Sequence, residues 1–202
     1  MSASSKPQTA LSVRERLLSA AGILFYNQGI SATGIDMITA KAGVAKMSLY
    51  NNFSSKSDLV AAFIEARHQE WVDLYQLRLN NAHTPEERIL AVFDAYADHA
   101  EFDYEKGFRG CGLLNAAAEL TVGDKGREAV RRHKEEIERF LVQHLHEFRR
   151  TDGGLLSQET VDTTAEHLAF LLEGSFSRAG LEGNSNRVHQ ARRLAETILA
   201  AL

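Results

Sequence analysis

The sequence predicts an all-helical protein organised in two parts. Only two prolines, Pro7 and Pro85, occur in 202 residues, so most of the chain is free to be helical. Helix-capping signals recur along the chain, whereas no run of alternating β-branched residues is long enough to indicate a strand. An apolar content of 44% and a charged content of 25% are typical of a globular protein that buries a core.

Three short helices are expected first. The first begins at the capping box Ser12-Val-Arg-Glu15 and ends at Gly29, a position that favours a left-handed backbone. The second follows Thr33-Gly34, and the third covers about residues 45–53. These last two helices meet at the turn 42–44, and two short helices joined at a glycine form a helix-turn-helix unit.

Six further helices are expected after residue 56. The clearest start is Thr84-Pro85-Glu86-Glu87, with a cap, a proline in the first turn and two acids at the positive end of the helix dipole. The expected ranges are about 57–80, 84–104, 113–120, 124–150, 157–182 and 186–202. The predicted organisation is a disordered tail at 1–10, a three-helix head at 11–56 and a roughly six-helix bundle at 57–202.

Charge separates the two parts of the chain. The net charge is −4, but residues 1–56 hold six basic and two acidic side chains, a balance of +4. The rest of the chain holds 17 basic and 25 acidic side chains, a balance of −8. A basic head on an acidic body is what attraction to phosphate at one end requires.

The third helix carries the side chains best suited to contact DNA. In a helix-turn-helix unit the second helix lies in the major groove, and its N-terminal residues contact base edges. Lys46 and Ser48 are expected on bases or nearby phosphates, with Met47 available for a thymine methyl group. Tyr50 and Lys56 are expected on phosphates, although Tyr50 would also suit half-buried packing. The complete predicted DNA-binding set is Thr33, Gly34, Lys46, Met47, Ser48, Tyr50, Asn51, Asn52 and Lys56, with double-stranded DNA as the partner.

This segment also carries a family resemblance. The stretch 35–59, with its core Leu49-Tyr50-Asn-Asn-Phe53-Ser-Ser-Lys56, resembles the N-terminal domain of TetR/AcrR-type transcriptional repressors. The resemblance extends from about residue 14 to about residue 63. Gly34 and Ala45 depart from it, because such repressors usually carry Ser or Thr at these two helix starts.

The resemblance implies a ligand-binding body that releases the DNA. An unknown small-molecule effector would bind among the C-terminal helices, the helix at 57–80 would tilt, and the heads would leave a palindromic operator. The aromatic and polar residues predicted to line this cavity are Trp71, Tyr75, Tyr96, Cys111, Asn115, Glu119, Phe140, His144 and Phe170. The alternative is that the aromatic residues form core and that Asn115 bonds to backbone.

The last two helices are expected to form a homodimer interface. Their apolar residues predicted at that interface are Leu168, Leu172, Phe176, Leu194 and Ile198. The alternative is that these residues close the core of a single chain. A two-fold dimer would present two third helices about one DNA turn, or a multiple, apart.

Other classes of function have weak support. The sequence contains no phosphate-binding loop, no nucleophile elbow and no His-Glu-x-x-His motif, so an enzyme is not expected, nor is a cofactor. His144 and His146 point to different faces of a helix, and no metal site is predicted. The single cysteine and the lack of an apolar run near ~20 residues predict a cytoplasmic protein without a membrane span. The alternatives to a regulator are an all-helical enzyme and a helical interaction protein without DNA binding.

Overall fold

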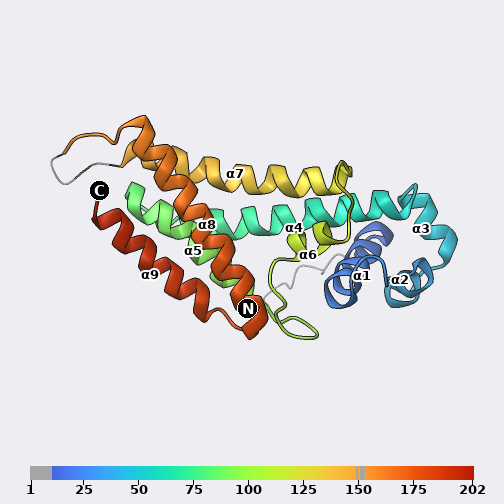
Figure 1. Cartoon of the computed structure of the whole chain (residues 1–202). Helices are drawn as coiled ribbons and strands as arrows, with labels where there is room; N and C mark the ends of the chain where they lie inside the picture. The colour runs from blue at the N-terminus through green and yellow to red at the C-terminus, as the bar shows by residue number, and fades with distance from the viewer. Residues whose placement is uncertain (1–10, 149, 151–152) are drawn as a thin grey trace, which may run out of the picture. The chain divides into compact units, whose positions relative to one another are not determined.

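The computed structural model describes residues 11–148, 150 and 153–202, and every regular element within them is a helix (Figure 1). The all-helical prediction is therefore confirmed. The predicted tail at 1–10 lies outside the described residues. In chain order the helices of the described part are α1 (Val13–Gln28), α2 (Ile35–Ala42), α3 (Lys46–Asn52), α4 (Lys56–Leu79), α5 (Pro85–Ala100), α6 (Gly112–Ala118), α7 (Lys125–Glu147), α8 (Gln158–Glu182) and α9 (Asn186–Ala200).

The chain divides into two compact units, Met1–Phe63 and Ile64–Leu202, and the division falls inside α4. The first unit is called the head below and the second the body. The boundary that the sequence placed at residue 56 stays a prediction. None of the helices in the described residues is long and apolar enough to cross a membrane.

The head is a small helical core in which α1 packs against both α2 and α3. The predicted capping box starts α1: the Ser12 side chain accepts from the Glu15 amide, and the Glu15 carboxylate accepts from the Ser12 amide. Leu17 of α1 and Leu49 of α3 are fully buried in this core. Phe25 meets Phe63 edge to face, with ring centroids 5.5 Å apart.

The body is built around α5, which packs against α7, α8 and α9. α8 in turn packs against both α7 and α9. Thr84 caps α5 as predicted, with the reciprocal bond from Glu87. One continuous apolar core results, because α5 is buried over most of its surface.

Two predicted helix ends were wrong by a few residues. α5 ends at Ala100 instead of residue 104, and α7 ends at Glu147 instead of residue 150. After α5, the carboxylate of Glu101 accepts from Ser185 Oγ at 2.7 Å and lies 3.2 Å from His189 Nε2. These contacts with the start of α9 are tertiary, so helix periodicity alone did not reveal them.

The segment between α5 and α6 lies directly against α8. A Cβ atom added to Gly180 would lie 2.5 Å from the Gly110 backbone, closer than real contacts allow. Gly110 itself has a φ of 80°, which favours glycine. This approach of two glycines places the next residue, Cys111, beside the core of the body.

Candidate nucleic-acid interface and ligand cavity

α3 presents an outer face that is mostly polar. Leu49 and the following Phe53 are buried against the head, as their spacing of four predicts. Met47 is 70% exposed, and Lys46, Tyr50 and Asn51 are exposed as well. The helix therefore turns Lys46, Met47, Tyr50 and Asn51 outward and buries Leu49 in the head.

Two lysines of the predicted DNA-binding set already have partners within the head. Lys46 Nζ lies 2.8 Å from Asp36 Oδ1 on α2, and both side chains are well exposed. The hydrogen bond and the charge of Asp36 raise the pKa of Lys46. Lys56 Nζ donates to the Ile30 carbonyl oxygen at 2.6 Å, which fixes this side chain at the start of α4.

The predicted contact of Thr33 needs correction, whereas that of Asn52 stays a prediction. The Thr33 side chain is fully buried, its hydroxyl donates to the Gly29 carbonyl oxygen at 2.6 Å, and its amide donates to Ile30. Thr33 therefore closes the turn before α2 and faces away from the surface. Asn52 Nδ2 donates to the Ser48 carbonyl oxygen at 2.8 Å, so its amide nitrogen serves its own helix.

The starts of α2 and α3 lack side-chain caps. Gly34 and Ala45 occupy the two N-cap positions, and neither helix start has a side-chain hydrogen bond to its first amides. Gly34 is exposed, and nothing lies within 4 Å of a Cβ atom added there. The two departures from the family pattern thus remove a cap at each helix of the unit.

Arg16 is a residue of the head that sequence reasoning did not single out. Its guanidinium donates to the Ala42 carbonyl oxygen from two nitrogens, at 3.1 and 2.6 Å, and to the Gly43 carbonyl oxygen at 2.7 Å. It thereby holds the turn between α2 and α3 onto α1. The only sequence signal was a basic residue on the first helix, which gave no indication of a partner 26 residues away.

A small cavity of about 20 Å³ lies among five helices of the body. Its volume is roughly that of one water molecule. α4, α5, α7 and α8 contribute side chains, and the remaining wall comes from Cys111 and the start of α6. The lining residues are Arg67, Trp71, Tyr96, His99, Cys111, Gly112, Leu113, His133 and Phe176.

A partly buried lysine lies beside this cavity. Lys134 Nζ lies 2.6 Å from Glu173 Oε1, donates to Tyr96 Oη at 3.2 Å, and lies 3.7 Å from Cys111 Sγ. Burial lowers the pKa of Lys134, but the acidic groups Cys111, Tyr96 and Glu173 raise it by more, so the net shift is upward. The ammonium group therefore remains charged near neutral pH, with Glu173 as its counter-ion.

The structure brings together only part of the predicted ligand set. Trp71, Tyr96 and Cys111 line the cavity. Tyr75, Phe140 and His144 form an adjoining aromatic group, in which Tyr75 Oη lies 2.6 Å from His144 Nε2.

The other three predicted ligand residues lie elsewhere. Asn115 is exposed and donates to the Arg109 carbonyl oxygen at 3.1 Å, which is the alternative that the sequence left open. Glu119 is exposed at the end of α6. Phe170 is 65% exposed on α8, because it lies on the face of that helix turned away from the core.

Six lining residues are absent from the predicted ligand set: Arg67, His99, Gly112, Leu113, His133 and Phe176. They come from α4, α5, α6, α7 and α8, and no local pattern connects them or the adjacent Lys134. His133 Nδ1 lies 2.5 Å from His68 Nδ1, a pairing that joins residues 65 positions apart. Among the described residues, no group of three or more His, Cys, Asp or Glu side chains is arranged to hold a metal ion.

The predicted dimer residues divide into two groups. Leu168, Leu172 and Phe176 are buried in the core of the single chain, so their placement at an interface needs correction. Leu194 is exposed, and Ile198 is half-buried against the core. Helix periodicity correctly gave α8 an apolar side, but that side packs within the chain.

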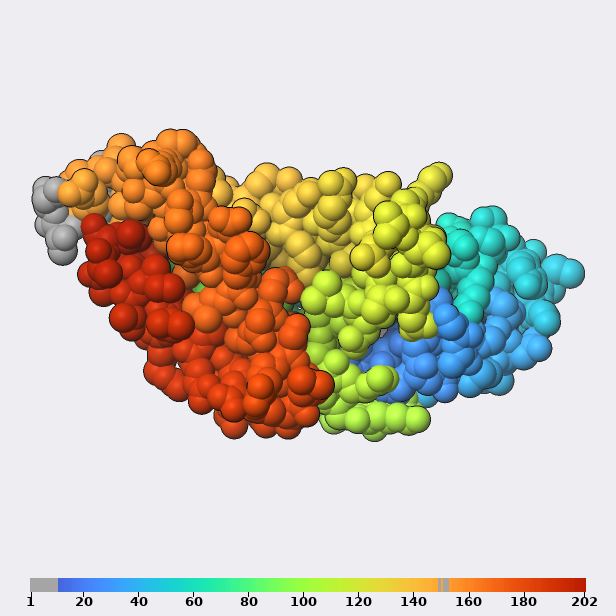
Figure 2. Space-filling model, in the orientation of Figure 1, coloured from blue at the N-terminus to red at the C-terminus, as the bar shows by residue number. Residues whose placement is uncertain are grey.

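An outward groove lies between α8 and α9, which Figure 2 shows exposed side by side in orange and red. Its volume is about 470 Å³, and Phe170 and Leu194 are its most exposed large apolar residues. The remaining lining residues are Leu171, Gly174, Ser175, Arg178, Arg187, Gln190 and Ala191.

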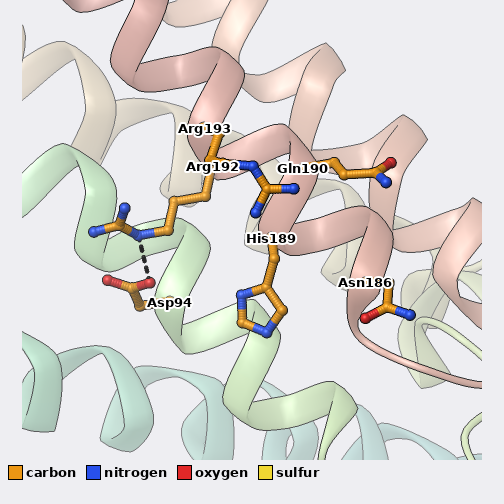
Figure 3. Close-up of a pocket in the computed structure, with 6 residues that line it drawn as sticks. All are labelled: Asp94, Asn186, His189, Gln190, Arg192 and Arg193. Carbon is orange, nitrogen blue, oxygen red and sulfur yellow. Dashed lines mark hydrogen bonds and ion pairs between the residues drawn. The ribbon is translucent and has the colours of Figure 1, made fainter.

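A second surface hollow lies between α5 and α9 and is lined by polar side chains (Figure 3). Arg192 Nε lies 2.6 Å from Asp94 Oδ1, and Arg192 also pairs with Glu196. Two carboxylates therefore neutralise the charge of Arg192, and this side chain does not attract an anionic ligand to the hollow.

Comparison with known proteins decides the family. Residues 17–63 match the family described as bacterial regulatory proteins of the tetR family. Residues 85–195, more than half of the chain, match the tetracycline repressor-like C-terminal domain. The chain belongs to the TetR family.

Related proteins and structures agree with this assignment to the TetR family. A segment of 96 residues is 34% identical to the HTH-type transcriptional activator FasR of Mycolicibacterium smegmatis, and covers 48% of this chain and 43% of FasR. A segment of 89 residues is 32% identical to the transcriptional repressor KstR2 of the same organism, and covers 44% and 43% of the two chains. The chain thus matches less than half the length of these two curated relatives.

A TetR-family transcriptional regulator from Streptomyces coelicolor has a similar structure over nearly the whole chain. The TM-score is 0.79 at 27% sequence identity, covering 93% of this chain and 94% of that one. The TetR fold therefore extends through both the head and the body.

Proposed function

We propose that this TetR-family protein is a DNA-binding transcriptional repressor that a small molecule releases from a palindromic operator, and that it is not an enzyme. The exposed face of α3 carries this proposal, because an apolar side chain as exposed as Met47 beside Lys46 and Tyr50 suits a partner surface. The names of the relatives include both an activator and a repressor, and repression is the direction proposed here. Because chromosomal DNA is the proposed partner, the cytoplasm is the proposed location.

Lys46, Met47, Ser48 and Asn51 are the residues proposed to contact base edges or neighbouring phosphates. Tyr50 and Lys56 are proposed to contact phosphates, since Lys56 is fixed by its bond to Ile30 and keeps further N–H donors. The uncapped starts of α2 and α3 support the proposal that this face of the head contacts phosphates. Backbone amides at helix starts bind phosphate well, and neither Gly34 nor Ala45 supplies a competing side chain.

A homodimer is proposed to form through the groove between α8 and α9. Phe170 and Leu194 are large apolar side chains exposed in that groove, and their burial against a second copy would be favourable. A two-fold axis there would make the contact self-complementary and would pair two heads with two half-sites.

The effector is proposed to act through the cavity of the body. α4 contributes Arg67 and Trp71 to the cavity and begins at Lys56 in the head, so a ligand that changes the position of α4 reaches both units. Ligand and operator must then favour different conformations, and their antagonism must be reciprocal.

The test begins with a selection of genomic fragments by the purified, dimeric protein, followed by a salt titration on the enriched site. A near-palindrome with a steep salt dependence is expected. Lys56→Ala should weaken binding to all sequences about tenfold and lower the salt slope by about one, because one phosphate contact is lost. Lys106→Ala, which removes an exposed lysine of the body, is the matched control and should change neither quantity.

The same titration separates base contacts from phosphate contacts. Lys46→Ala should change the order of preference among operator variants. Equal losses on every sequence would remove Lys46 from the base contacts. Failure of the folded dimer to enrich any fragment in ligand-free buffer would contradict the proposed function as a whole.

A further inference from the structure

Two buried polar atoms at the cavity of the body lack a hydrogen-bond partner. Trp71 Nε1 and His99 Nδ1 are both fully shielded from solvent and make no hydrogen bond within the described part of the chain. Trp71 is 3% exposed and His99 7%, and both residues line the cavity. An indole N–H can only donate, so the cavity lacks an acceptor for Trp71.

The charged groups around the cavity have counter-ions. Lys134 pairs with Glu173 at 2.6 Å, and Arg67 pairs with Glu70 at 2.9 Å. Burial, together with the nearby positive charges, lowers the pKa of His99 to about 4 and that of His133 to about 2, so both rings are neutral near pH 7. An ionised ligand would have to be buried against charges that are already compensated, which is costly.

Aromatic rings dominate the walls. The Tyr96 and Phe176 rings meet edge to face at 4.7 Å between centroids, and Trp71 meets Tyr96 at 5.6 Å. His133 meets the Trp71 ring at 5.8 Å. Ring faces and ring edges of these side chains favour an aromatic ligand, because aromatic groups attract one another edge to face or in offset stacks.

The size of the cavity restricts the ligand further. Ligand sites commonly measure roughly 300–1,000 Å³, whereas this cavity measures about 20 Å³. Any organic ligand must therefore separate the helices that line it, and a small ligand needs the smallest separation. This expansion is also what would couple the cavity to α4.

We propose that the effector of this cavity is a small, uncharged, single-ring aromatic compound whose oxygen accepts a hydrogen bond from Trp71 Nε1. A phenol is the simplest member of this class, because its hydroxyl group both accepts and donates and therefore suits either tautomer of His99. The inference rests on the proposed function, since it specifies the effector of the same regulator.

The test is a calorimetric titration of the full-length dimer with phenol, toluene and benzoate near pH 7.5. The three probes share one ring and differ only in carrying a neutral oxygen, no polar atom or a carboxylate. Phenol is expected to bind at least tenfold more tightly than either of the others. Equal binding of phenol and toluene, tighter binding of benzoate, or no binding at all would overturn the inference; the last result would make the cavity a water site.

Two variants identify the atom responsible. Trp71→Phe removes the indole N–H and should reduce phenol affinity at least tenfold, towards that of toluene. Phe102→Leu is the control, because the Phe102 ring stacks on His99 at 5.4 Å but does not line the cavity. Unchanged phenol affinity in Trp71→Phe would overturn the inference, and the probe series on the unmodified protein decides the question if this variant does not fold.

Operator binding is measured on the same preparation without any probe. A protein that enriches an operator but ignores phenol refutes only the effector class. A protein that binds phenol but enriches no DNA refutes the proposed regulator and keeps the assignment of the cavity.

Discussion

The head and the body each contain a lysine paired with a carboxylate, and the two pairs differ mainly in their surroundings. Lys46 and Asp36 lie 2.8 Å apart in the head, with side chains 56% and 81% exposed. Lys134 and Glu173 lie 2.6 Å apart in the body, with side chains 18% and 31% exposed. Water can replace either partner of the first pair and has less access to the second, above all to the ammonium group of Lys134.

This difference suits two kinds of recognition. An exposed ammonium group can exchange a carboxylate for a DNA phosphate at little cost, because both states are solvated. The ammonium group of Lys134 cannot leave Glu173 without becoming an uncompensated buried charge. The head is thus arranged to change partners, whereas the buried pair fixes one wall of the cavity in place.

Removal of the buried counter-ion is expected to have the largest effect. Glu173→Ala should lower the free energy of unfolding by about 3–4 kcal/mol, because it leaves Lys134 charged and unpaired. Urea unfolding followed by the fluorescence of Trp71, the only tryptophan of the sequence, measures the body directly. Asp36→Ala is the matched change in the exposed pair of the head, which contains no tryptophan. Its thermal unfolding, followed by the loss of helix content, should be unchanged. A small effect of Glu173→Ala would show that the two pairs are solvated alike.

The second prediction uses pH to test burial in the body. The pKa of His99 is lowered to about 4 by burial and by the charges of Arg67 and Lys134. The unfolded chain, in which histidine has its ordinary pKa of about 6.5, therefore takes up a proton before the folded protein does as the pH falls. His99 therefore leaves the free energy of unfolding unchanged above pH 6.5. Between pH 6.5 and pH 4 its protonation in the unfolded chain lowers this free energy by about 3 kcal/mol in all.

Urea titrations between pH 7.5 and pH 4 measure this loss. Carboxylates and other histidines contribute to the same curve, so the comparison is with His99→Gln, which cannot take up the proton. The variant should lose about 3 kcal/mol less over this range than the unmodified protein. Identical slopes would mean that His99 takes up its proton in the folded protein over the same pH range as in the unfolded chain, so the cavity would gain a charge as the pH falls.

The contrast between the head and the body also explains what the sequence predicted well. The capping box at Ser12, the cap at Thr84 and the spacing of Leu49 and Phe53 are local signals, and the structure contains each of them. The outer face of α3 follows from these local signals. Thr33, in the turn before α2, was misplaced because its hydroxyl finds a backbone partner inside that turn.

The cavity was predicted less well because its walls come from five helices. Trp71, Tyr96 and Cys111 were found as aromatic or unusual residues, but His99 and Lys134 gain their meaning only from partners on other helices. The dimer set shows the same limit. Leu168 and Phe170 are two residues apart, yet one is buried in the core and the other is exposed in the groove, and only helix packing decides which.

The smallest predicted effect concerns the exposed pair and has the opposite sign. Asp36→Asn removes the counter-ion of Lys46 and a negative charge from the surface proposed to meet DNA. Operator affinity should rise about threefold at low salt, and the salt slope should steepen by up to about one, because Lys46 becomes free to neutralise a phosphate. The thermal midpoint should not change, since exposed pairs contribute little to stability. Ser57→Asn, at an exposed position of α4, is the matched control and should leave the affinity unchanged. A loss of affinity in Asp36→Asn would instead mean that Asp36 holds Lys46 in its DNA-binding position, and the exposed pair would then resemble the buried one.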